Sequence, residues 1–375
     1  MSEYQYYEFQ AVDRPLTDAD RKMLRGISSR AVISATSLTN TYEWGNFKGD
    51  PAKLMARCFD LHLYLTNWGT HRLMIRVPAR LVDRRLLDTC LGGGEAARVL
   101  EAGDNLILDI QRDEIEEDEG YDDNGLLAGM APLRADLLAG DSRLFYLLWL
   151  MGVENDAFDA DAPEPLPGLG PLTGAMAAFA EFFVIDRDLV LAAAGRPAAA
   201  PATAASAGAV RELIAGKTER EKTDLLVRLA EGDPRVGVEL RREAHLRVAA
   251  EVPAPPRRNA LELYAAAAVI RQERERAAAE AAMAEAVRRE KAAAVARRKR
   301  LDTLTQRGAD VWREVEAEIA RRNAQGYDRA TALLVDLAAI AAEQGTKADY
   351  ARRMASVRVE HEAKKRFIER IEGLG

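Results

Sequence analysis

The amino-acid sequence predicts an α+β N-terminal domain followed by an all-α C-terminal region with a long coiled-coil-like helix and helical hairpins. Residues 1–200 contain alternating apolar runs, turn signals and three of the four tryptophans, a pattern typical of strands mixed with helices. Residues 201–375 follow a helical pattern of Ala, Arg, Glu and Leu nearly to the end. The first part holds 19 Lys and Arg against 32 Asp and Glu, whereas the second holds 34 against 28, so the two parts differ in the sign of their charge.

The overall composition narrows the class of protein. A chain of 375 residues with 48% apolar residues can bury the cores of two or three domains. A net charge of −7 gives the whole chain no strong attraction to nucleic acid. The longest apolar run, Leu144–Val153, has about half of the roughly 20 residues that a membrane span needs, so we expect no membrane association. Two cysteines and no secretory leader are typical of a reducing compartment, and we expect a cytoplasmic protein.

The first 110 residues carry the signals of a small sheet with two or three helices. Runs of alternating or β-type residues predict strands at 4–12, 30–36, 61–66, 72–77 and 105–111. The pair at 61–66 and 72–77 is the best hairpin signal, because a turn sequence with Asn and Gly separates two alternating runs. Thr17 and Asp50 are capping residues that open helices, the second with Pro51 at its first helical position.

The next hundred residues combine an acidic loop, apolar helices and two linkers. Residues 113–123 hold eight acids in eleven, and these must stay solvated because burial would desolvate eight carboxylates. Helical patterns follow at 126–139, 141–153, 173–185 and 188–194. Proline-rich or Ala-rich composition predicts linkers at 156–171 and 196–208.

The second part reads as helices throughout. A capping box, Thr218 with Glu221, opens a helix at 219–231, and a second helix runs to about Ala250. From Asn259 to about Asn323 the pattern stays helical for about 65 residues. Two more helices are expected at 328–343 and 346–371, divided by a glycine.

Two segments resemble known families. Three motifs, Tyr4–Phe9 with Asp13–Leu16, Tyr42–Pro51 and Leu63–Thr70, make residues 1–150 similar to an uncharacterised bacterial protein family. That resemblance implies no activity.

The C-terminal 50 residues resemble the helical tail of bacterial SWIM-type zinc-finger proteins. The matching residues are Tyr327, Asp328, Ala330, Leu333, Leu334, Asp336, Leu337, Tyr350, Arg358, His361, Lys364, Lys365, Phe367, Leu374 and Gly375. The resemblance implies TPR-like helical pairs that bind protein. The Cys-x-Cys and Cys-x-His zinc ligands of that family do not occur in this sequence, so its zinc and nucleic-acid functions are not carried over.

These signals divide the chain into five segments. We expect an α+β domain with apolar helices (1–155), linkers and short helices (156–208), a helical hairpin (209–257), a long charged helix (258–323) and a TPR-like helical hairpin (324–375).

Metal or nucleophilic chemistry has one candidate group in the sequence. Cys58, His62, His71 and Cys90 supply the residue mix that zinc takes, but neither the Cys-x-x-Cys nor the His-x-x-x-His spacing is present. Cys58 falls among apolar helical residues, which disfavours a reactive thiolate. We therefore expect core cysteines, turn or surface histidines, no catalytic residue, no metal site and no cofactor.

Aromatic residues on two loops are the interaction candidates of the first domain. They are Trp44, Phe47, Lys48, Trp68 and His71. Aromatic side chains beside a lysine can stack on a ligand or a base. The alternative, which we favour, is that the two tryptophans close the ends of the small sheet, because Trp is usually buried.

A basic segment at 288–300 is the candidate for nucleic-acid contact. Its basic residues are Arg288, Arg289, Lys291, Arg297, Arg298, Lys299 and Arg300. A basic helical face can follow phosphates. The alternative, again favoured, is a solvated helix supported by local pairs such as Glu273–Arg276 and Glu285–Arg289.

We therefore expect a non-enzymatic interaction or adaptor protein. The C-terminal contacts would come from Tyr327, Leu333, Leu334 and Tyr350, which lie in the TPR-like segment. The helix at 271–300 has too little apolar surface to stand alone, so it bridges two packed bodies or pairs with a partner chain, including a second copy. A nucleic-acid-associated accessory protein is the alternative, and an enzyme sited near Trp44, Trp68 and His71 is expected least.

Overall fold

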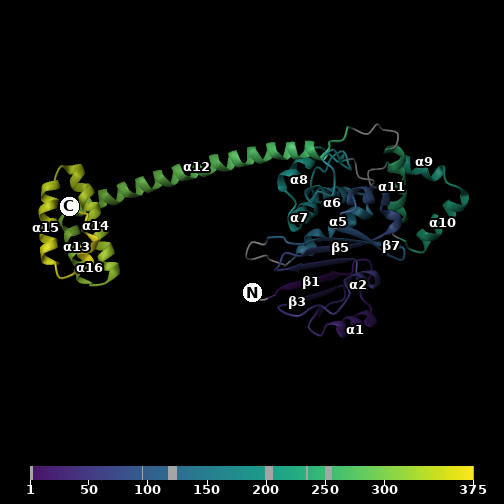
Figure 1. Ribbon diagram of the computed structural model, residues 1–375, viewed down its shortest axis with the longest axis horizontal. Helices are drawn as coiled ribbons and strands as arrows, with labels where there is room; N and C mark the ends of the chain where they lie inside the picture. The colour runs from purple at the N-terminus through teal and green to yellow at the C-terminus, as the bar shows by residue number, and fades with distance from the viewer. Residues whose placement is uncertain are drawn as a thin grey trace. The chain divides into compact units, whose positions relative to one another are not determined.

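A computed structural model of the chain describes residues 3–94, 96–116, 125–198, 206–233, 235–249 and 256–374. The chain forms two compact units, Met1–Arg274 and Glu275–Gly375, and the division falls inside helix α12 (Ala260–Arg307). All strands of the described residues belong to the first unit, and from α12 onward the chain is helical (Figure 1). The predicted fold class, an α+β region followed by an all-α region, is confirmed.

The first unit is built on a seven-stranded antiparallel sheet with the order β2-β3-β1-β4-β5-β7-β6. The strands are β1 (Gln5–Gln10), β2 (Val32–Ile33), β3 (Ser37–Tyr42), β4 (Leu61–Thr66), β5 (His71–Pro78), β6 (Ala97–Ala102) and β7 (Asn105–Arg112). The predicted hairpin is β4–β5, with Leu63 opposite Leu73. Strands β3 and β6 were not predicted, because the first is mostly polar and the second is charged and lies at the sheet edge.

Side chains alternate across the sheet, so each face has its own core. On one face Phe9, Met74 and Ile107 pack with α1 (Asp18–Ile27) and α2 (Pro51–Arg57). The capping residues Thr17 and Asp50 begin these two helices as predicted. On the other face the leucines of β4 pack with the apolar helices that follow the sheet in sequence. Figure 1 shows α1 on one side of the sheet and α5 to α7 on the other.

The helices of this second core are short except for one. They are α3 (Arg84–Leu91), α4 (Leu126–Met130), α5 (Pro132–Leu138), α6 (Arg143–Glu154), α7 (Gly174–Phe182) and α8 (Arg187–Ala194). Helix α6 is buried from Leu144 to Val153, as its apolar composition predicts. The single helix predicted at 126–139 is instead divided at Pro132, whose ring cannot continue a helix.

The segment 156–171 is irregular but is not a free linker. Glu164 is fully buried, where its carboxylate accepts hydrogen bonds from the Tyr146 hydroxyl and from the Arg258 guanidinium at 2.9 Å. Leu169 is fully buried in the same core as α6. This segment, which the sequence predicts to be a linker, is therefore part of the first unit. The side chains of Tyr146 and Arg258 hold its buried carboxylate in place.

Three peripheral helices also belong to the first unit: α9 (Ala207–Ala215), α10 (Glu219–Ala230) and α11 (Val236–Ala249). The capping box of Thr218 and Glu221 is confirmed. Helix α9 begins inside the predicted second linker, of which residues 199–205 lie outside the described residues. Arg235 binds Asp13 at 2.6 Å, which ties this helical layer to the strand region.

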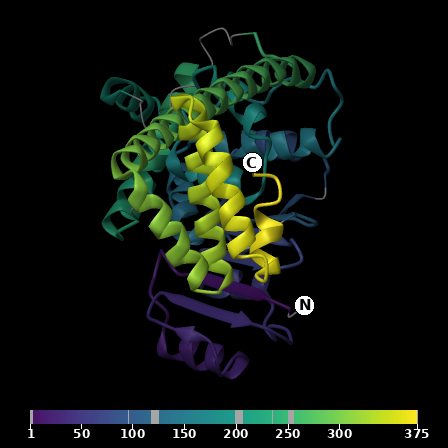
Figure 2. The same ribbon diagram turned by 90° about the vertical axis from the view of Figure 1, so that its left-hand side faces the viewer.

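The second unit consists of the end of α12 and four further helices, which Figure 2 shows gathered together. They are α13 (Ala309–Ala320), α14 (Ala324–Gln344), α15 (Lys347–Glu360) and α16 (Lys365–Arg370). The helix predicted to reach Asn323 is broken at Gly308, which has a φ of +56°. The predicted division at Gly345 is confirmed, and the further break between α15 and α16 was not predicted.

The middle of α12 is solvent-exposed at every residue from 272 to 300. Ion pairs one turn apart run along it, Arg276 with Glu280 at 2.9 Å and Arg289 with Glu285 at 2.6 Å. The second of these is a pair that the sequence predicts. Among the described helices, neither α12 nor any other combines the length and apolarity that crossing a bilayer requires.

Candidate interaction surfaces

A groove of about 600 Å³ lies within the second unit. The end of α12, the start of α13, the end of α14 and the start of α15 form its walls. Two helix breaks create it, since Gly308 turns α13 away from α12 and Gly345 turns α15 back from α14. Apolar lining comes from Leu304, Trp312, Leu337, Ile340, Ala341 and Tyr350.

Trp312 is the aromatic residue that the groove leaves half-buried. Its ring centroid is 6.0 Å from that of Tyr350, and the guanidinium carbon of Arg353 lies over it at 5.4 Å from the centroid. Tyr350 donates its hydroxyl to the carbonyl of Leu334 at 3.1 Å. Burial raises the pKa of Tyr350, so its hydroxyl remains a neutral donor. The indole is thus partly exposed and in cation–π contact with Arg353.

The charged residues of the groove are Asp349, Arg352 and Arg353. Arg352 forms an ion pair with Asp349 one turn earlier on α15. Arg353 lies over the indole, and its guanidinium is solvent-exposed. The groove is therefore lined by both apolar and polar side chains, and its charged residues sum to one net positive charge.

The contact residues that the sequence predicts for this unit are buried in its core, and one of them, Tyr350, also lines the groove. Tyr327, Leu333, Leu334 and Tyr350 are between 0% and 9% exposed and belong to the unit's core. Their side chains hold α14 to its neighbours, and a partner could not reach most of their surface. Their role in partner contact stays a prediction, and within the described residues only Tyr350 of the four lines the groove. Sequence reasoning missed Trp312, although a lone tryptophan in an Ala-rich, charged helical region was an available signal.

Two of the aromatic-loop candidates in the first unit are core residues. Phe47 packs on Tyr7 with ring centroids 5.0 Å apart. His71 is fully buried, and its ring stacks on Phe182 at 4.5 Å. Lys48 is exposed. Phe47 and His71 are therefore corrected from surface candidates to packing residues.

The two loop tryptophans are exposed, by 69% for Trp44 and 48% for Trp68. The favoured expectation that they close the ends of the sheet is therefore wrong. Their loops follow β3 and β4, which flank β1, and Gln5 pairs with the last residue of each strand. Because antiparallel register fixes these positions, both loops lie at the same end of the sheet.

The basic segment of α12 is exposed, and part of it is engaged in ion pairs. Arg289 pairs with Glu285, Arg298 with Glu343 at 2.8 Å, and Arg300 with Asp336 at 2.6 Å. Within the described part of the chain, four basic side chains form no ion pair: Arg288, Lys291, Arg297 and Lys299. The segment keeps a net positive, solvated face.

The cysteines and histidines considered for zinc are dispersed over both faces of the sheet. Cys58 belongs to the core of α1 and α2, and Cys90 to the opposite core. Burial raises the pKa of Cys58 to about 11 and that of Cys90 to about 12, so both thiols stay protonated near neutral pH. Burial lowers the pKa of His62 to about 3. These groups do not converge on one point.

A second cleft, of about 930 Å³, lies between β6, β7 and α6. Four of its charged side chains have partners within the first unit: Arg98, Asp109, Arg112 and Asp113. Asp109 accepts hydrogen bonds from Arg72 and Arg98 at 2.6 and 2.8 Å, and Arg112 pairs with Glu154 at 3.0 Å. Most of the charged groups that line the cleft are therefore already bonded within the protein and are not free to bind a ligand.

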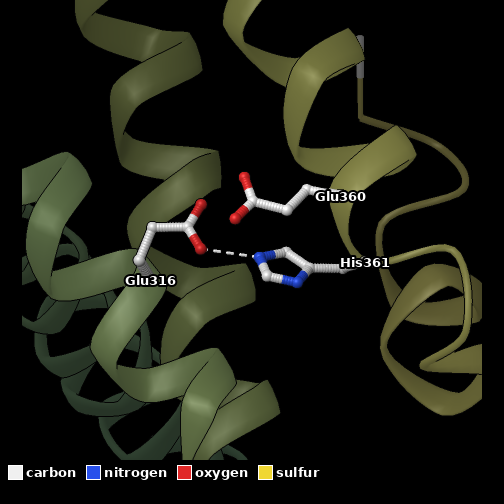
Figure 3. Close-up of side chains that lie close together, drawn as sticks. All are labelled: Glu316, Glu360 and His361. Carbon is white, nitrogen blue, oxygen red and sulfur yellow. Dashed lines mark hydrogen bonds and ion pairs between the residues drawn. The ribbon is translucent and has the colours of Figure 1, made fainter.

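One group of possible metal ligands occurs in the described part of the chain (Figure 3). Glu316 of α13 faces Glu360 and His361, which end α15. One ligand atom from each lies within 4.8 Å of the others. The Nε2 of His361 is 2.6 Å from Glu316, and its Nδ1 is 3.1 Å from the Nζ of Lys364.

Comparison with known proteins found no match. No protein-family model, curated protein or solved structure matches this chain. The two resemblances drawn from sequence motifs stay predictions.

Proposed function

We propose that this protein is a non-enzymatic adaptor whose C-terminal groove binds a peptide segment of another protein. The segment would carry an apolar anchor that packs on Trp312 and an acidic side chain that pairs with Arg353. The helical pairs around the groove would act as a short TPR-like unit. The buried, unpaired thiols of Cys58 and Cys90 support a cytoplasmic location as part of this proposal.

The observation that carries the proposal is the composition of the groove. The apolar part of the lining, with its half-buried indole, gains free energy when a partner covers it, because water leaves the ring. Arg353 offers a planar guanidinium that can hydrogen-bond a carboxylate with two donors. Amphipathic helices bind grooves between helices in this way, with apolar anchors spaced by one turn.

A peptide-display selection on the full chain tests the proposal. Enriched peptides are expected to combine two or more large apolar residues with Asp or Glu. Arg353→Glu should weaken the selected peptides at least about tenfold, since it replaces attraction by repulsion. Peptide affinities would be measured by fluorescence anisotropy, and circular dichroism would check that each variant is folded.

Arg366→Glu is the matched control, because Arg366 is exposed on α16 and does not line the groove. It makes the same change of net charge and should leave peptide affinity unchanged. If both variants lost peptide affinity equally, or if basic peptides were enriched, the groove would not bind an acidic segment as proposed.

The exposed tryptophans of the first unit form the second part of the proposal. Trp44 and Trp68 would bind a further partner, because both are exposed at the same end of the sheet and tryptophan is enriched in protein interfaces. A pull-down from native lysate, with and without nuclease, should recover a specific protein in both cases. Trp44→Ala with Trp68→Ala should abolish that recovery while Val32→Ala, at an equally exposed residue, retains it.

A nucleic-acid-associated role is the second candidate, favoured by the four unpaired basic residues of α12. Binding of a labelled duplex should then weaken steeply as salt rises. Replacing Arg288, Lys291, Arg297 and Lys299 by Gln should reduce the salt dependence, whereas Arg276→Gln should not. Recovery of partners that is lost after nuclease treatment would favour this role over the adaptor.

A further inference from the structure

The geometry of Glu316, Glu360 and His361 points to a binding site for a divalent transition-metal ion, and we propose that they form one. Two carboxylates and one imidazole are donors that Zn²⁺ and its first-row neighbours accept. In Figure 3 both carboxylates and the Nε2 edge of the imidazole are directed into the same space between α13 and the end of α15. The proposal does not depend on the adaptor function.

Electrostatics favour a cation at this point. Glu316 and Glu360 bring two negative charges together, and within the described residues Glu360 has no ion-pair or hydrogen-bond partner. Glu360 is also the last residue of α15, where the partial negative charge of the helix end disfavours a carboxylate. A cation between the carboxylates removes both sources of repulsion.

The imidazole is held firmly enough to serve as a ligand. His361 is 7% exposed, and its ring packs edge-on against Phe367 at 6.1 Å between centroids. Its backbone N–H closes α15 by donating to Val357 at 3.1 Å. The fixed imidazole and the two more mobile carboxylates would supply three protein ligands. The remaining coordination positions of the metal ion would be taken by water.

Lys364 competes with the metal for this site. Its ammonium can only donate, so the Nδ1 of His361 accepts the hydrogen bond and Nε2 carries the proton donated to Glu316. A metal at Nε2 requires the other tautomer, in which the proton lies on Nδ1 and faces Lys364. The Lys364 side chain must then rotate into solvent, and its half-buried position allows this. Lys364 therefore lowers metal affinity.

Calorimetric titration of the chelator-treated full chain with ZnCl₂ at pH 7.5 tests the site. Wild type should bind zinc with an affinity that Lys364→Met raises and Glu360→Gln lowers, each by about tenfold or more. Both residues are peripheral to the core, so both variants should fold. Cobalt titration should add visible absorption bands that Glu360→Gln weakens.

Glu362→Gln is the matched control, since Glu362 is an exposed neighbour on the same segment but not a member of the group. It should bind zinc as wild type does. If the zinc affinity were unchanged in both Glu360→Gln and Lys364→Met, the proposal would be overturned, because zinc would then bind at other carboxylates. An absence of binding at millimolar zinc in wild type and Lys364→Met would overturn it as well.

Discussion

Asp60 shows at the level of one residue how the first unit is tied together. Its carboxylate is fully buried and accepts hydrogen bonds from the backbone of Val12 and Asp13 at 2.7 and 2.9 Å. It also accepts from Arg76 at 2.7 Å and from Arg134 at 3.3 Å. A buried carboxylate with this many donors holds strand, helix and loop in one arrangement, and removing it leaves the largely buried guanidinium of Arg76 without its anion.

Asp60→Ala should therefore lower the free energy of unfolding of the first unit by about 3–5 kcal/mol. Urea unfolding followed by circular dichroism measures this. Asp18→Ala removes another carboxylate paired with an arginine, but one that is exposed, so its effect should stay within about 0.5 kcal/mol. Similar losses in the two variants would mean that the Asp60 network contributes little.

His62 makes the first unit sensitive to acid. Its ring is fully buried and stacks on Phe9 at 3.9 Å, and its Nδ1–H donates to the carbonyl of Glu8 at 2.9 Å. Its buried Nε2 has no hydrogen-bond partner. Burial lowers the pKa from 6.5 to about 3, so between these values the unfolded chain binds a proton that the folded chain does not. Stability contributed by neutral His62 is thus complete above pH 6.5 and is lost as the pH falls toward 3.

His62→Phe should reduce this pH dependence, because phenylalanine keeps the stacking and binds no proton. The urea midpoint of wild type should fall between pH 7.5 and 5.0 by more than that of the variant. The other histidines are common to both proteins, so the difference reports His62. Parallel pH profiles would show that His62 is protonated in the folded state or hydrated.

At the level of secondary-structure elements, two helix breaks determine the shape of the groove. Gly308 ends α12 with a φ of +56° and a ψ of −124°, a conformation that only glycine adopts without strain. Gly345 ends α14 in the left-handed conformation that favours glycine. The first break was not expected, because the apolar pattern of α12 continues into α13 without interruption.

Gly308→Ala should destabilise the second unit by about 1–3 kcal/mol and weaken peptide binding in the groove. Thermal unfolding and peptide anisotropy measure the two effects. Gly373→Ala is the control in the same unit, since its φ is not positive and a methyl group there would contact nothing within 4 Å. Unchanged stability in Gly308→Ala would show that the helix boundary can relax.

At the level of the whole molecule, the two units have separate cores. The first core includes Leu263 and Ala267 from the start of α12, and the second includes Leu301 and Leu304 from its end. From 275 to 297 every residue of the helix is solvent-exposed, and the helix relies on alanine propensity and exposed ion pairs, which contribute only tenths of a kcal/mol each. Local opening should therefore be easiest there.

Limited trypsin digestion should cut first within 276–297, where exposed basic residues lie on the solvent-exposed middle of α12. Mass spectrometry identifies the cuts, and circular dichroism of the two fragments should show separate cooperative unfolding transitions. Ala284→Gly should speed this cleavage, because glycine weakens an exposed helix by about 1 kcal/mol. Loss of cooperative unfolding in both fragments would mean that the units depend on an intact α12.

Local signals in the sequence were sufficient for much of the fold. The alternation of β4 and β5, the caps at Thr17 and Thr218 and the apolar run of α6 each specify an element without reference to the rest of the chain. Strand β3 could not be found in this way, because its polar residues form a strand only when β1 supplies hydrogen-bond partners.

The candidate sites were much less accessible from sequence. Leu334 and Tyr350 carried a helical pattern that fits a core and a contact surface equally well, and only packing showed that both are buried. Trp312, Arg353 and the ligand group of Glu316, Glu360 and His361 come from helices that are distant in sequence. No local pattern brings such residues together.

The sequence by itself determined the division into an α+β part and a helical part, because alternation, helical periodicity and capping act over a few neighbouring residues. Only the tertiary structure decided that residues 156–194 complete the first core, that the loop tryptophans are exposed, and where groove and ligand group form. These features depend on which surfaces meet, and contacts between residues far apart in the chain are set by packing of the whole unit.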